Sequence, residues 1–316
     1  MANGPVYVAG HRGLVGSAIV RAMARAGMEP PLVRTRDELD LRDQEAVRAF
    51  FQKERPSAVF MAAAKVGGIL ANDTYRWDFL FENLQIEANV LGSALDSDVE
   101  RLVFFGSSCI YPKLAPQPIR EDYLLTGPLE PTNEPYAIAK IAGVKLVDAA
   151  NSQYGRRWIS LMPTNLYGPG DNFDLAGSHV LPAMIRKFHE AKIRRTRGED
   201  SAVQLWGSGA VRREFMHVDD LASAALHALS ANVTGLFNVG TGSDITISGL
   251  AHLVAATVEY DGGVDWDRSM PDGTPRKLLD STKMRGIGWT PEIDLADGIR
   301  ETYRWYITSG GHRADA

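Results

Sequence analysis

Three glycines near the N-terminus constrain the fold more than any other feature of this sequence. Gly10, Gly13 and Gly16 directly follow a short apolar run at residues 6–9 and precede an amphipathic stretch. A loop between a strand and a helix turns its backbone amides, and the positive end of the helix, towards one point where a pyrophosphate can bind. The spacing differs from the Gly-x-Gly-x-x-Gly of many dehydrogenases, so a plain tight turn is the alternative. The place of the loop after a first strand predicts a dinucleotide-binding loop.

Short apolar, β-branched runs alternate with amphipathic stretches along much of the chain. Such runs are typical of buried strands in a parallel sheet, and the stretches between them are typical of the covering helices. The predicted strands are residues 6–9, 31–34, 58–62, 101–106, 158–163 and 236–239. The predicted helices are residues 16–26, 43–54, 80–97, 136–154 and 218–230. This order predicts an α/β fold with a Rossmann-type doubly wound parallel sheet.

The alternation weakens after residue 166, and proline, glycine and charged residues become denser between His179 and Arg213. Residues 218–239 again resemble a helix and a strand that return to the main sheet. We therefore predict two domains. Residues 1–166 and 215–240 form a Rossmann domain for the cofactor, and residues 167–214 and 241–316 form a smaller, discontinuous C-terminal α/β domain for the substrate.

Composition and charge argue against several classes of partner. The 34 Lys and Arg residues against 39 Asp and Glu residues give a net charge of −5, without a long basic block. We therefore expect neither nucleic acid nor an anionic membrane surface as a partner. No apolar run approaches the roughly 18 residues of a membrane-spanning helix, and the N-terminus lacks the pattern of a signal peptide. A single cysteine excludes an intrachain disulfide, so we expect a cytoplasmic protein.

The residues after the second predicted strand indicate which dinucleotide the loop binds. An NAD site places an acidic residue about 20 positions after the loop, but residues 33–36 contain none. Arg36, helped by Arg12 in the loop, would instead attract a 2′-phosphate through charge-assisted hydrogen bonds. Arg36 as an ordinary surface arginine, or Arg34 in its place, are the alternatives. We predict NADP as the cofactor, with Asp40 and Leu41 bordering the adenine.

Tyr136 and Lys140 are spaced i, i+4 in a predicted helix, which places a phenol and an ammonium on one face. A phenol with a pKa of about 10 acts as an acid or base near neutral pH only where a positive charge stabilises the phenolate. Lys140 supplies that charge. Ser107, at the end of the fourth predicted strand, is placed to hold a substrate oxygen near the phenol. These three residues predict a proton-relay site.

Cys109 is the single cysteine of the chain and follows Ser107 by two residues. In an extended segment, side chains two residues apart point to the same side, so the thiol would face the same cavity as Ser107. A lone cysteine is also commonly a small buried apolar residue, and that reading stays open. His189, His217, His227 and His252 lie in helical patterns and form no cluster with the thiol, so we predict no metal.

The glycine loop, the strand-end serine and the Tyr-x-x-x-Lys pair together resemble the short-chain dehydrogenase/reductase family in its extended form. The resemblance covers nearly the whole chain, including the segments at residues 165–169 and 213–220. Members act mostly on nucleotide-sugars, which the small C-terminal domain grips. The resemblance implies a homodimer formed through the helices at residues 80–97 and 136–154.

Three further segments, at residues 62–69, 106–112 and 170–182, resemble one group of this family. That group epimerises and then reduces GDP-4-keto-6-deoxy-mannose with NADPH, so the resemblance implies this substrate and NADP(H). It assigns His179 as the acid that partners Cys109, Lys187 and Arg213 as phosphate contacts, Trp206 as an apolar wall and Asp272 as a sugar or ribose acceptor. The cofactor contacts that it implies are Gly10, Arg12, Gly13, Leu14, Val15, Gly16, Arg36, Asp40, Leu41, Ala63, Lys140, Pro163, Asn165, Leu166 and His179.

The two reactions can share one site. A ketone at carbon 4 acidifies the hydrogens on carbons 3 and 5, and inversion then needs a base on one face and an acid on the other. Thiol and imidazole suit these roles because their ordinary pKa values lie near neutrality. Two alternatives stay open: a related 4-epimerase, reductase or dehydratase that keeps its NAD bound, and a non-enzymatic NADP-binding regulator.

Overall fold

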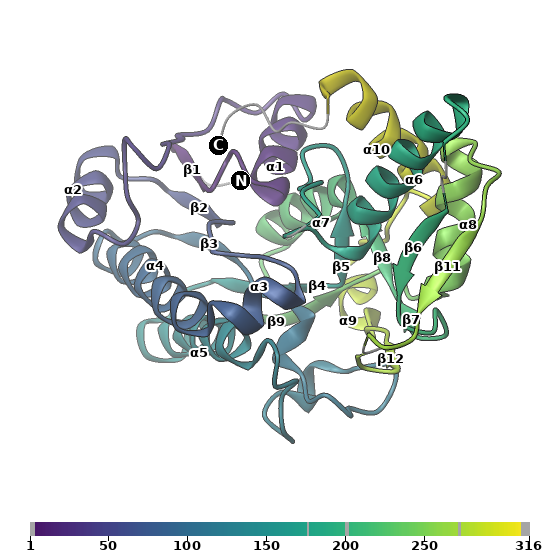
Figure 1. Cartoon of the computed structure of the whole chain (residues 1–316). Helices are drawn as coiled ribbons and strands as arrows, with labels where there is room; N and C mark the ends of the chain where they lie inside the picture. Colours follow the sequence, from purple (N-terminus) through teal and green to yellow (C-terminus); the bar gives the residue numbers. More distant parts are fainter. Residues whose placement is uncertain (1–3, 176, 200–201, 271–272, 311–316) are drawn as a thin grey trace.

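The computed structural model describes residues 4–175, 177–199, 202–270 and 273–310. Its centre is a five-stranded, all-parallel sheet in the order β1 (Val6–Ala9), β2 (Ala58–Met61), β3 (Arg101–Phe105), β4 (Ile159–Pro163) and β9 (Gly235–Val239) (Figure 1). Every residue of β2, β3 and β4 is buried, as expected for strands covered by helices on both faces. The predicted doubly wound α/β fold is confirmed.

The strand predicted at residues 31–34 is wrong. Only a single bridge forms there, in which Leu32 donates to the Val6 carbonyl and accepts from the Val8 amide. Pro30, which would face β1 as Leu32 does, has no amide hydrogen to donate, so the ladder does not extend before Leu32. The bridge lies beside β1 on the side away from β2, so the chain reverses direction across the sheet next to β1. Ligands bind at such a switch point in open α/β sheets.

The five predicted helices are present, with starts between four residues earlier and one residue later than predicted. They are α1 (Leu14–Arg25), α2 (Gln44–Glu54), α4 (Arg76–Asp96), α5 (Glu134–Tyr154) and α7 (Val218–Ser230). The Asp43 carboxylate caps α2 by accepting from the Ala46 amide, and Gly155 ends α5 in the left-handed conformation. α1 packs against α7, and α4 packs against α5, so the two helix pairs cover opposite faces of the sheet.

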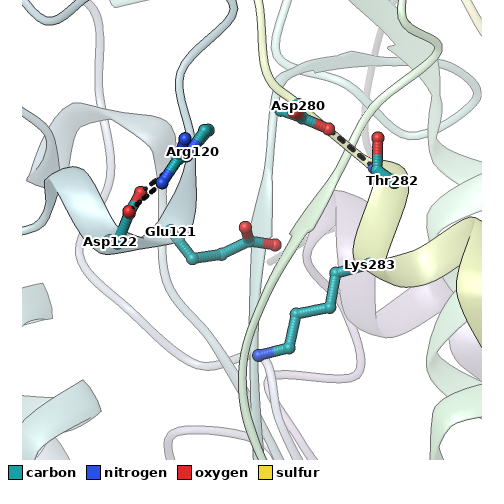
Figure 2. A pocket seen from close by; sticks show the side chains of 6 residues that line it. All are labelled: Arg120, Glu121, Asp122, Asp280, Thr282 and Lys283. Atoms are coloured by element: carbon teal, nitrogen blue, oxygen red, sulfur yellow. Dashed lines mark hydrogen bonds and ion pairs between the residues drawn. The ribbon is translucent and has the colours of Figure 1, made fainter.

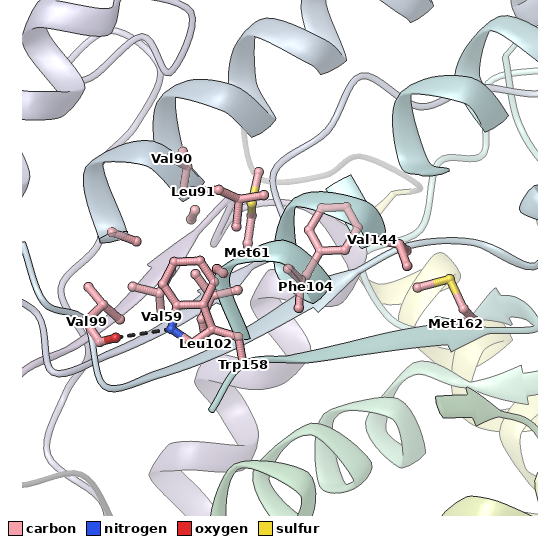
Figure 3. Packing of buried hydrophobic residues seen from close by; sticks show 14 of the residues in the cluster. Val59, Met61, Val90, Leu91, Val99, Leu102, Phe104, Val144, Trp158 and Met162 are labelled. Carbon is pink, nitrogen blue, oxygen red and sulfur yellow. Dashed lines mark hydrogen bonds between the residues drawn. The ribbon is translucent and has the colours of Figure 1, made fainter. Parts of the chain in front are cut away.

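Apolar clusters lie on both faces of the sheet. The cluster under α4 and α5 surrounds Trp158 and Phe104, and the Trp158 indole donates to the Val99 carbonyl at 3.1 Å (Figure 3). The cluster under α1 and α7 also receives Met284 and Trp289 from the C-terminal region. This region therefore contributes to the packing of the main sheet.

A third cluster packs α6 (Val180–Thr196), α8 (Ile247–Val258) and α10 (Leu295–Ser309) around residues such as Phe188 and Leu250. The sequence analysis did not predict these helices. It also missed α3 (Ile69–Thr74), the 3₁₀ turns η1 (Ser108–Ile110) and η2 (Glu121–Tyr123), β5 (Asn165–Tyr167), β6 (Val203–Trp206), β7 (Arg212–Arg213), β8 (Phe215–His217), β10 (Ile245–Thr246), β11 (Val264–Asp267), β12 (Arg276–Lys277) and α9 (Thr282–Gly286). The division into two domains stays a prediction.

The edge of the sheet at β9 is closed by side chains. Glu121 accepts from the Asn238 amide at 2.9 Å, and the Lys283 ammonium donates to the Leu236 carbonyl at 2.6 Å. Both side chains line a pocket of about 400 Å³ together with Arg120, Asp122, Asp280 and Thr282 (Figure 2). No predicted site residue lines this pocket. Its polar groups satisfy backbone groups that an edge strand would otherwise expose.

Candidate active site

The glycine loop has the geometry of a phosphate cradle. Gly10 has a φ of +81°, and a Cβ there would lie 2.8 Å from the backbone of Ala63. A Cβ at Gly16 would lie 2.2 Å from the Gly10 carbonyl oxygen. Gly13 precedes α1, whose first turn has neither a side-chain cap nor an acidic residue. The backbone amides at this helix start are left for an anion, and the partial positive charge of the helix favours one.

We predict that Gly16→Ala disrupts this loop and lowers stability by about 2 kcal/mol, the usual cost of overpacking. The new methyl group would collide with a backbone carbonyl that cannot move without opening the loop. Thermal unfolding measures the loss of stability, and fluorescence titration with NADPH measures the disruption of the loop. Gly13→Ala is the matched control for stability, since its Cβ would contact the Gly10 carbonyl only at 3.4 Å. Equal unfolding midpoints for the two variants would contradict the steric argument.

The arginines after β1 differ in their availability. Arg34 forms an ion pair with Glu54 at 2.9 Å and lies over the Phe50 ring at 5.3 Å, so it is engaged with α2. Arg36 is exposed. Of the two alternatives for a 2′-phosphate, Arg36 therefore stays the better candidate.

The Asp40 side chain pairs with Arg42. Its carboxylate accepts from the Arg42 guanidinium at 2.6 Å, and this contact lowers the pKa of Asp40 to about 2. Leu41 packs against the core cluster under α4 and α5. The predicted contacts of Asp40 and Leu41 with adenine stay predictions.

The segment after β3 differs from the expected extended conformation. Ser107 is the cap of the 3₁₀ turn η1, and its Oγ accepts from the Cys109 amide at 3.3 Å. A cap with its own hydrogen-bonding side chain favours a turn over a continued strand. The Cys109 thiol is 7% exposed and still faces Ser107, because the two side chains interact directly. Burial raises the pKa of Cys109, whereas the charges of Lys277 and Lys140 lower it.

Tyr136 and Lys140 lie on one face of α5, with the ammonium 5.9 Å from the centre of the phenol ring. Burial raises the pKa of Tyr136 well above its ordinary value, and the neighbouring Cys109 and Glu87 add to that effect. The Lys140 ammonium lies 3.2 Å from Glu87 Oε1, and both side chains are almost fully buried. The structure therefore brings Ser107, Cys109, Tyr136 and Lys140 together, with a carboxylate that the sequence analysis missed.

His179 is the N-cap residue of α6. The segment just before it contacts the segment after β2, because the Gly68 amide donates to the Gly177 carbonyl at 3.1 Å. His179 is exposed by its surface area, and partial desolvation by the surrounding protein lowers the pKa of the imidazole. Among the described residues, His179 has no hydrogen bond or ion pair to the four residues above.

The end of the sheet also fixes the segment after β4. Pro163 is the last residue of β4, and the Asn165 side-chain amide donates to the Glu214 carbonyl at 2.8 Å. Leu166 follows in β5, which pairs in parallel with β8. The predicted cofactor contacts of Ala63, Pro163, Asn165 and Leu166 are untested.

Lys187 and Trp206 lie on α6 and β6, which both contribute residues to the third cluster. The Lys187 ammonium donates to the Gln204 carbonyl at 2.8 Å and lies over the ring of Trp206, which is 57% exposed. Arg213 lies in β7 opposite Lys277 in β12. Asp272 lies outside the described residues. Lys277, which was not predicted from the sequence, is a further residue of the site, because its charge interacts with the Cys109 thiol.

Within the described residues, no three His, Cys, Asp or Glu side chains are grouped as metal ligands would be. None of the helices in the same part of the chain is both long enough and apolar enough to cross a membrane.

A glycine cradle at the switch point of a parallel sheet, with a serine, a thiol, a phenol and an ammonium near the ends of the strands, defines a dinucleotide-dependent enzyme. The chain belongs to the NAD dependent epimerase/dehydratase family, which residues 6–240 match. The resemblance to the extended short-chain dehydrogenases/reductases is thereby confirmed, and the chain is an enzyme of this class.

Known relatives of the chain carry names more specific than that of the family. The chain is 52% identical to GDP-L-fucose synthase of Escherichia coli (strain K12), over 97% of this chain and 98% of that protein. It is 54% identical to GDP-L-fucose synthase 1 of Arabidopsis thaliana, over 96% and 93%. A solved GDP-mannoheptose C4 reductase from Campylobacter jejuni with NADP bound is 37% identical, with a TM-score of 0.89 over 97% and 99%.

Proposed function

We propose that the chain catalyses the GDP-L-fucose synthase reaction. It would epimerise carbons 3 and 5 of GDP-4-keto-6-deoxy-D-mannose and then reduce the 4-ketone to give GDP-L-fucose. The observation that carries this proposal is the position of Cys109, whose thiol faces Ser107 and lies near Tyr136 and Lys140. Relatives at 52% and 54% identity, named as GDP-L-fucose synthases, support the same activity.

The residues present fit NADPH. Gly10 and Gly16 leave room that a Cβ would fill, and the start of α1 offers free amides for the pyrophosphate. Arg12 and Arg36 would hold the 2′-phosphate, and Lys140 would contact the ribose next to the nicotinamide. NADPH supplies a hydride for the ketone.

Epimerisation is the part assigned to Cys109 and His179. Ser107 and Tyr136 hold the oxygen at carbon 4, so that it can carry the negative charge that develops on proton removal. The Cys109 thiolate removes the proton from carbon 3 or 5, and His179 returns a proton to the opposite face. The charges of Lys277 and Lys140 favour the thiolate against its burial. Partial desolvation lowers the pKa of His179, so its protonated ring is a stronger acid but less populated at neutral pH.

Reduction is the part assigned to Tyr136. As the ketone carbon receives hydride, its oxygen becomes an alkoxide and takes the phenolic proton. The phenolate left behind needs a nearby cation, and Lys140 is 5.9 Å from the ring centre. Epimerisation moves protons only: the thiol then releases its proton to solvent and the imidazole takes one up, so the cycle closes without the cofactor.

A homodimer through α4 and α5 is part of the proposal. Both helices present large apolar side chains to solvent: Trp77 and Phe81 on α4, and Ile138 and Leu146 on α5. Trp77 and Phe81 stack on each other at 5.3 Å. Large exposed apolar side chains on two neighbouring helices support an interface at this face. We keep a cytoplasmic location as a prediction from the sequence.

The alternatives differ in what they require. A 4-epimerase or dehydratase that keeps NAD bound needs an acidic ribose contact after residue 32, and residues 33–36 supply none. A non-enzymatic regulator does not fit a chain of this enzyme family. The GDP-sugar class is supported by both named relatives and by the solved reductase, so the particular sugar is the part to be tested.

The proposed function is tested by mixing the purified protein with NADPH and GDP-4-keto-6-deoxy-D-mannose. We expect NADPH oxidation, followed as a loss of its absorbance, and GDP-L-fucose as the product identified by chromatography. NADH serves as the control cofactor and should react more slowly. Turnover of a different GDP-linked 4-keto sugar, with none of this ketone, would assign the chain to another reaction of the same class.

A further inference from the structure

A buried ion pair beneath the proton relay carries a second inference. The Lys140 ammonium lies 3.2 Å from Glu87 Oε1, with side-chain exposures of 2% and 1%. The same ammonium lies 4.8 Å from the centre of the Phe104 ring. Removing two charges from water in this way costs free energy unless their mutual attraction compensates for the lost hydration. The pair lies between α4, which provides Glu87, and α5, which provides Lys140 and Tyr136.

The close packing of α4 on α5 leaves room for the Glu87 carboxylate only because residue 143 is glycine. A Cβ at Gly143 on α5 would lie 2.8 Å from Glu87 Oε2 and 2.2 Å from the Phe104 ring. Gly143 is one turn beyond Lys140 on the same helix. A larger residue at this position would push the Glu87 carboxylate away from the ammonium.

The charges around Tyr136 come from several elements. Lys140 on its own helix is the nearby cation, Glu87 from α4 is the nearby carboxylate, and Cys109 from η1 is the nearby thiol. Lys277 from β12 acts on the thiol. The Lys140 ammonium, which should stabilise the Tyr136 phenolate, therefore also pairs with the Glu87 carboxylate, and the negative charge of Glu87 disfavours that phenolate.

We propose that Glu87 is a positioning residue: its carboxylate holds the Lys140 ammonium and, through it, sets how firmly Tyr136 keeps its proton until the alkoxide forms. This inference rests on the proposed function, in which Tyr136 is the proton donor of the reduction. A donor must be protonated before hydride transfer and able to release its proton during the transfer. Glu87 favours the first condition and Lys140 the second.

The test is the pH dependence of ketone reduction in Glu87→Gln. Reduction falls with rising pH once Tyr136 loses its proton, so this basic limb reports the pKa of the phenol. Without the carboxylate the full charge of Lys140 acts on Tyr136, and we expect the limb to move to lower pH by about one unit. Glu87→Asp keeps the charge, so its limb should stay close to that of the wild type.

Asp220→Asn is the matched structural control. Asp220 is a buried carboxylate of α7 that accepts from the Glu292 and Ile293 amides, away from the relay. Its replacement should lower thermal stability without moving the basic limb. An unchanged limb in Glu87→Gln, or the same movement in Asp220→Asn, would overturn the inference. Wild-type turnover in either case leaves the proposed function intact.

A second measurement needs no substrate. Cys109 is the only cysteine of the chain, so its alkylation by iodoacetamide as a function of pH reports one thiol. Glu87→Gln should move this titration to lower pH, because the uncompensated Lys140 favours the thiolate. If Glu87→Gln does not fold, Lys140→Met should move the titration to higher pH. Lys140→Met/Glu87→Gln should then titrate like Lys140→Met, because Glu87 acts through Lys140. A clear difference between those two variants would overturn the inference, whichever sugar the enzyme uses.

Discussion

Replacing Cys109 with serine should slow solvent-deuterium incorporation at carbons 3 and 5 of the keto sugar by about a hundredfold to ten-thousandfold, the usual worth of a positioned base. A serine hydroxyl is far less acidic than a thiol, so it cannot be the base near neutral pH. Mass spectrometry of the sugar after incubation in D₂O measures the exchange. NADPH affinity should be nearly unchanged, because Cys109 is not among the predicted cofactor contacts.

The pH dependence of that exchange follows from the surroundings of the thiol. Burial raises the pKa of Cys109, and the charges of Lys277 and Lys140 oppose this effect. The base is the thiolate, so wild-type exchange should be slow below the pKa of the thiol and should rise with pH towards it. Cys109→Ser should lose this rise.

Ser108→Ala is the control for disturbance of the turn. Ser108 is buried in the same 3₁₀ turn, between Ser107 and Cys109, and has no assigned role. It should retain exchange within a few-fold of the wild type. Wild-type exchange in Cys109→Ser would remove the thiol from the mechanism and leave it as a buried apolar residue.

The main sheet was predictable because its strands are continuous apolar runs and its covering helices are amphipathic. The exception at residues 31–34 shows the limit of that signal. An apolar run predicts burial beside the sheet, but the number of ladder hydrogen bonds depends on which amides are present, and Pro30 removes one donor that would face β1. The helices of the third cluster were missed for a related reason. α6 begins with Pro182 in its first turn, where proline is tolerated, although the same residue resembles an irregular segment in sequence.

The candidate site was predictable where its residues are close in sequence or carry a motif. The glycine loop, the i, i+4 pair and the Ser107 to Cys109 segment are of this kind. Glu87 and Lys277 are not, because a single charged residue in a helix or a short strand resembles a solvent-exposed one. Only the packing of α4 on α5, and of β12 beside β7, brings these charges to the relay.

Tyr136→Phe should reverse the pattern expected for Cys109→Ser. Reduction of the ketone should fall by about a hundredfold to ten-thousandfold, because the alkoxide loses its proton donor. Deuterium exchange at carbons 3 and 5 should survive in part, since Cys109, His179 and Ser107 remain. Loss of NADPH absorbance measures the first effect, and mass spectrometry in D₂O measures the second.

Tyr7→Phe is the matched control for loss of a buried phenol. Tyr7 lies in β1 against Phe50 and Phe51, is 1% exposed, and takes no part in the site. Its replacement should leave both reduction and exchange close to wild type. Unimpaired hydride transfer in Tyr136→Phe would remove the phenol as proton donor. Equal loss of exchange and reduction would instead mean that Tyr136 mainly holds the ketone oxygen. The two reactions share that oxygen and differ in the group that moves the proton, so loss of the oxygen contact would slow both.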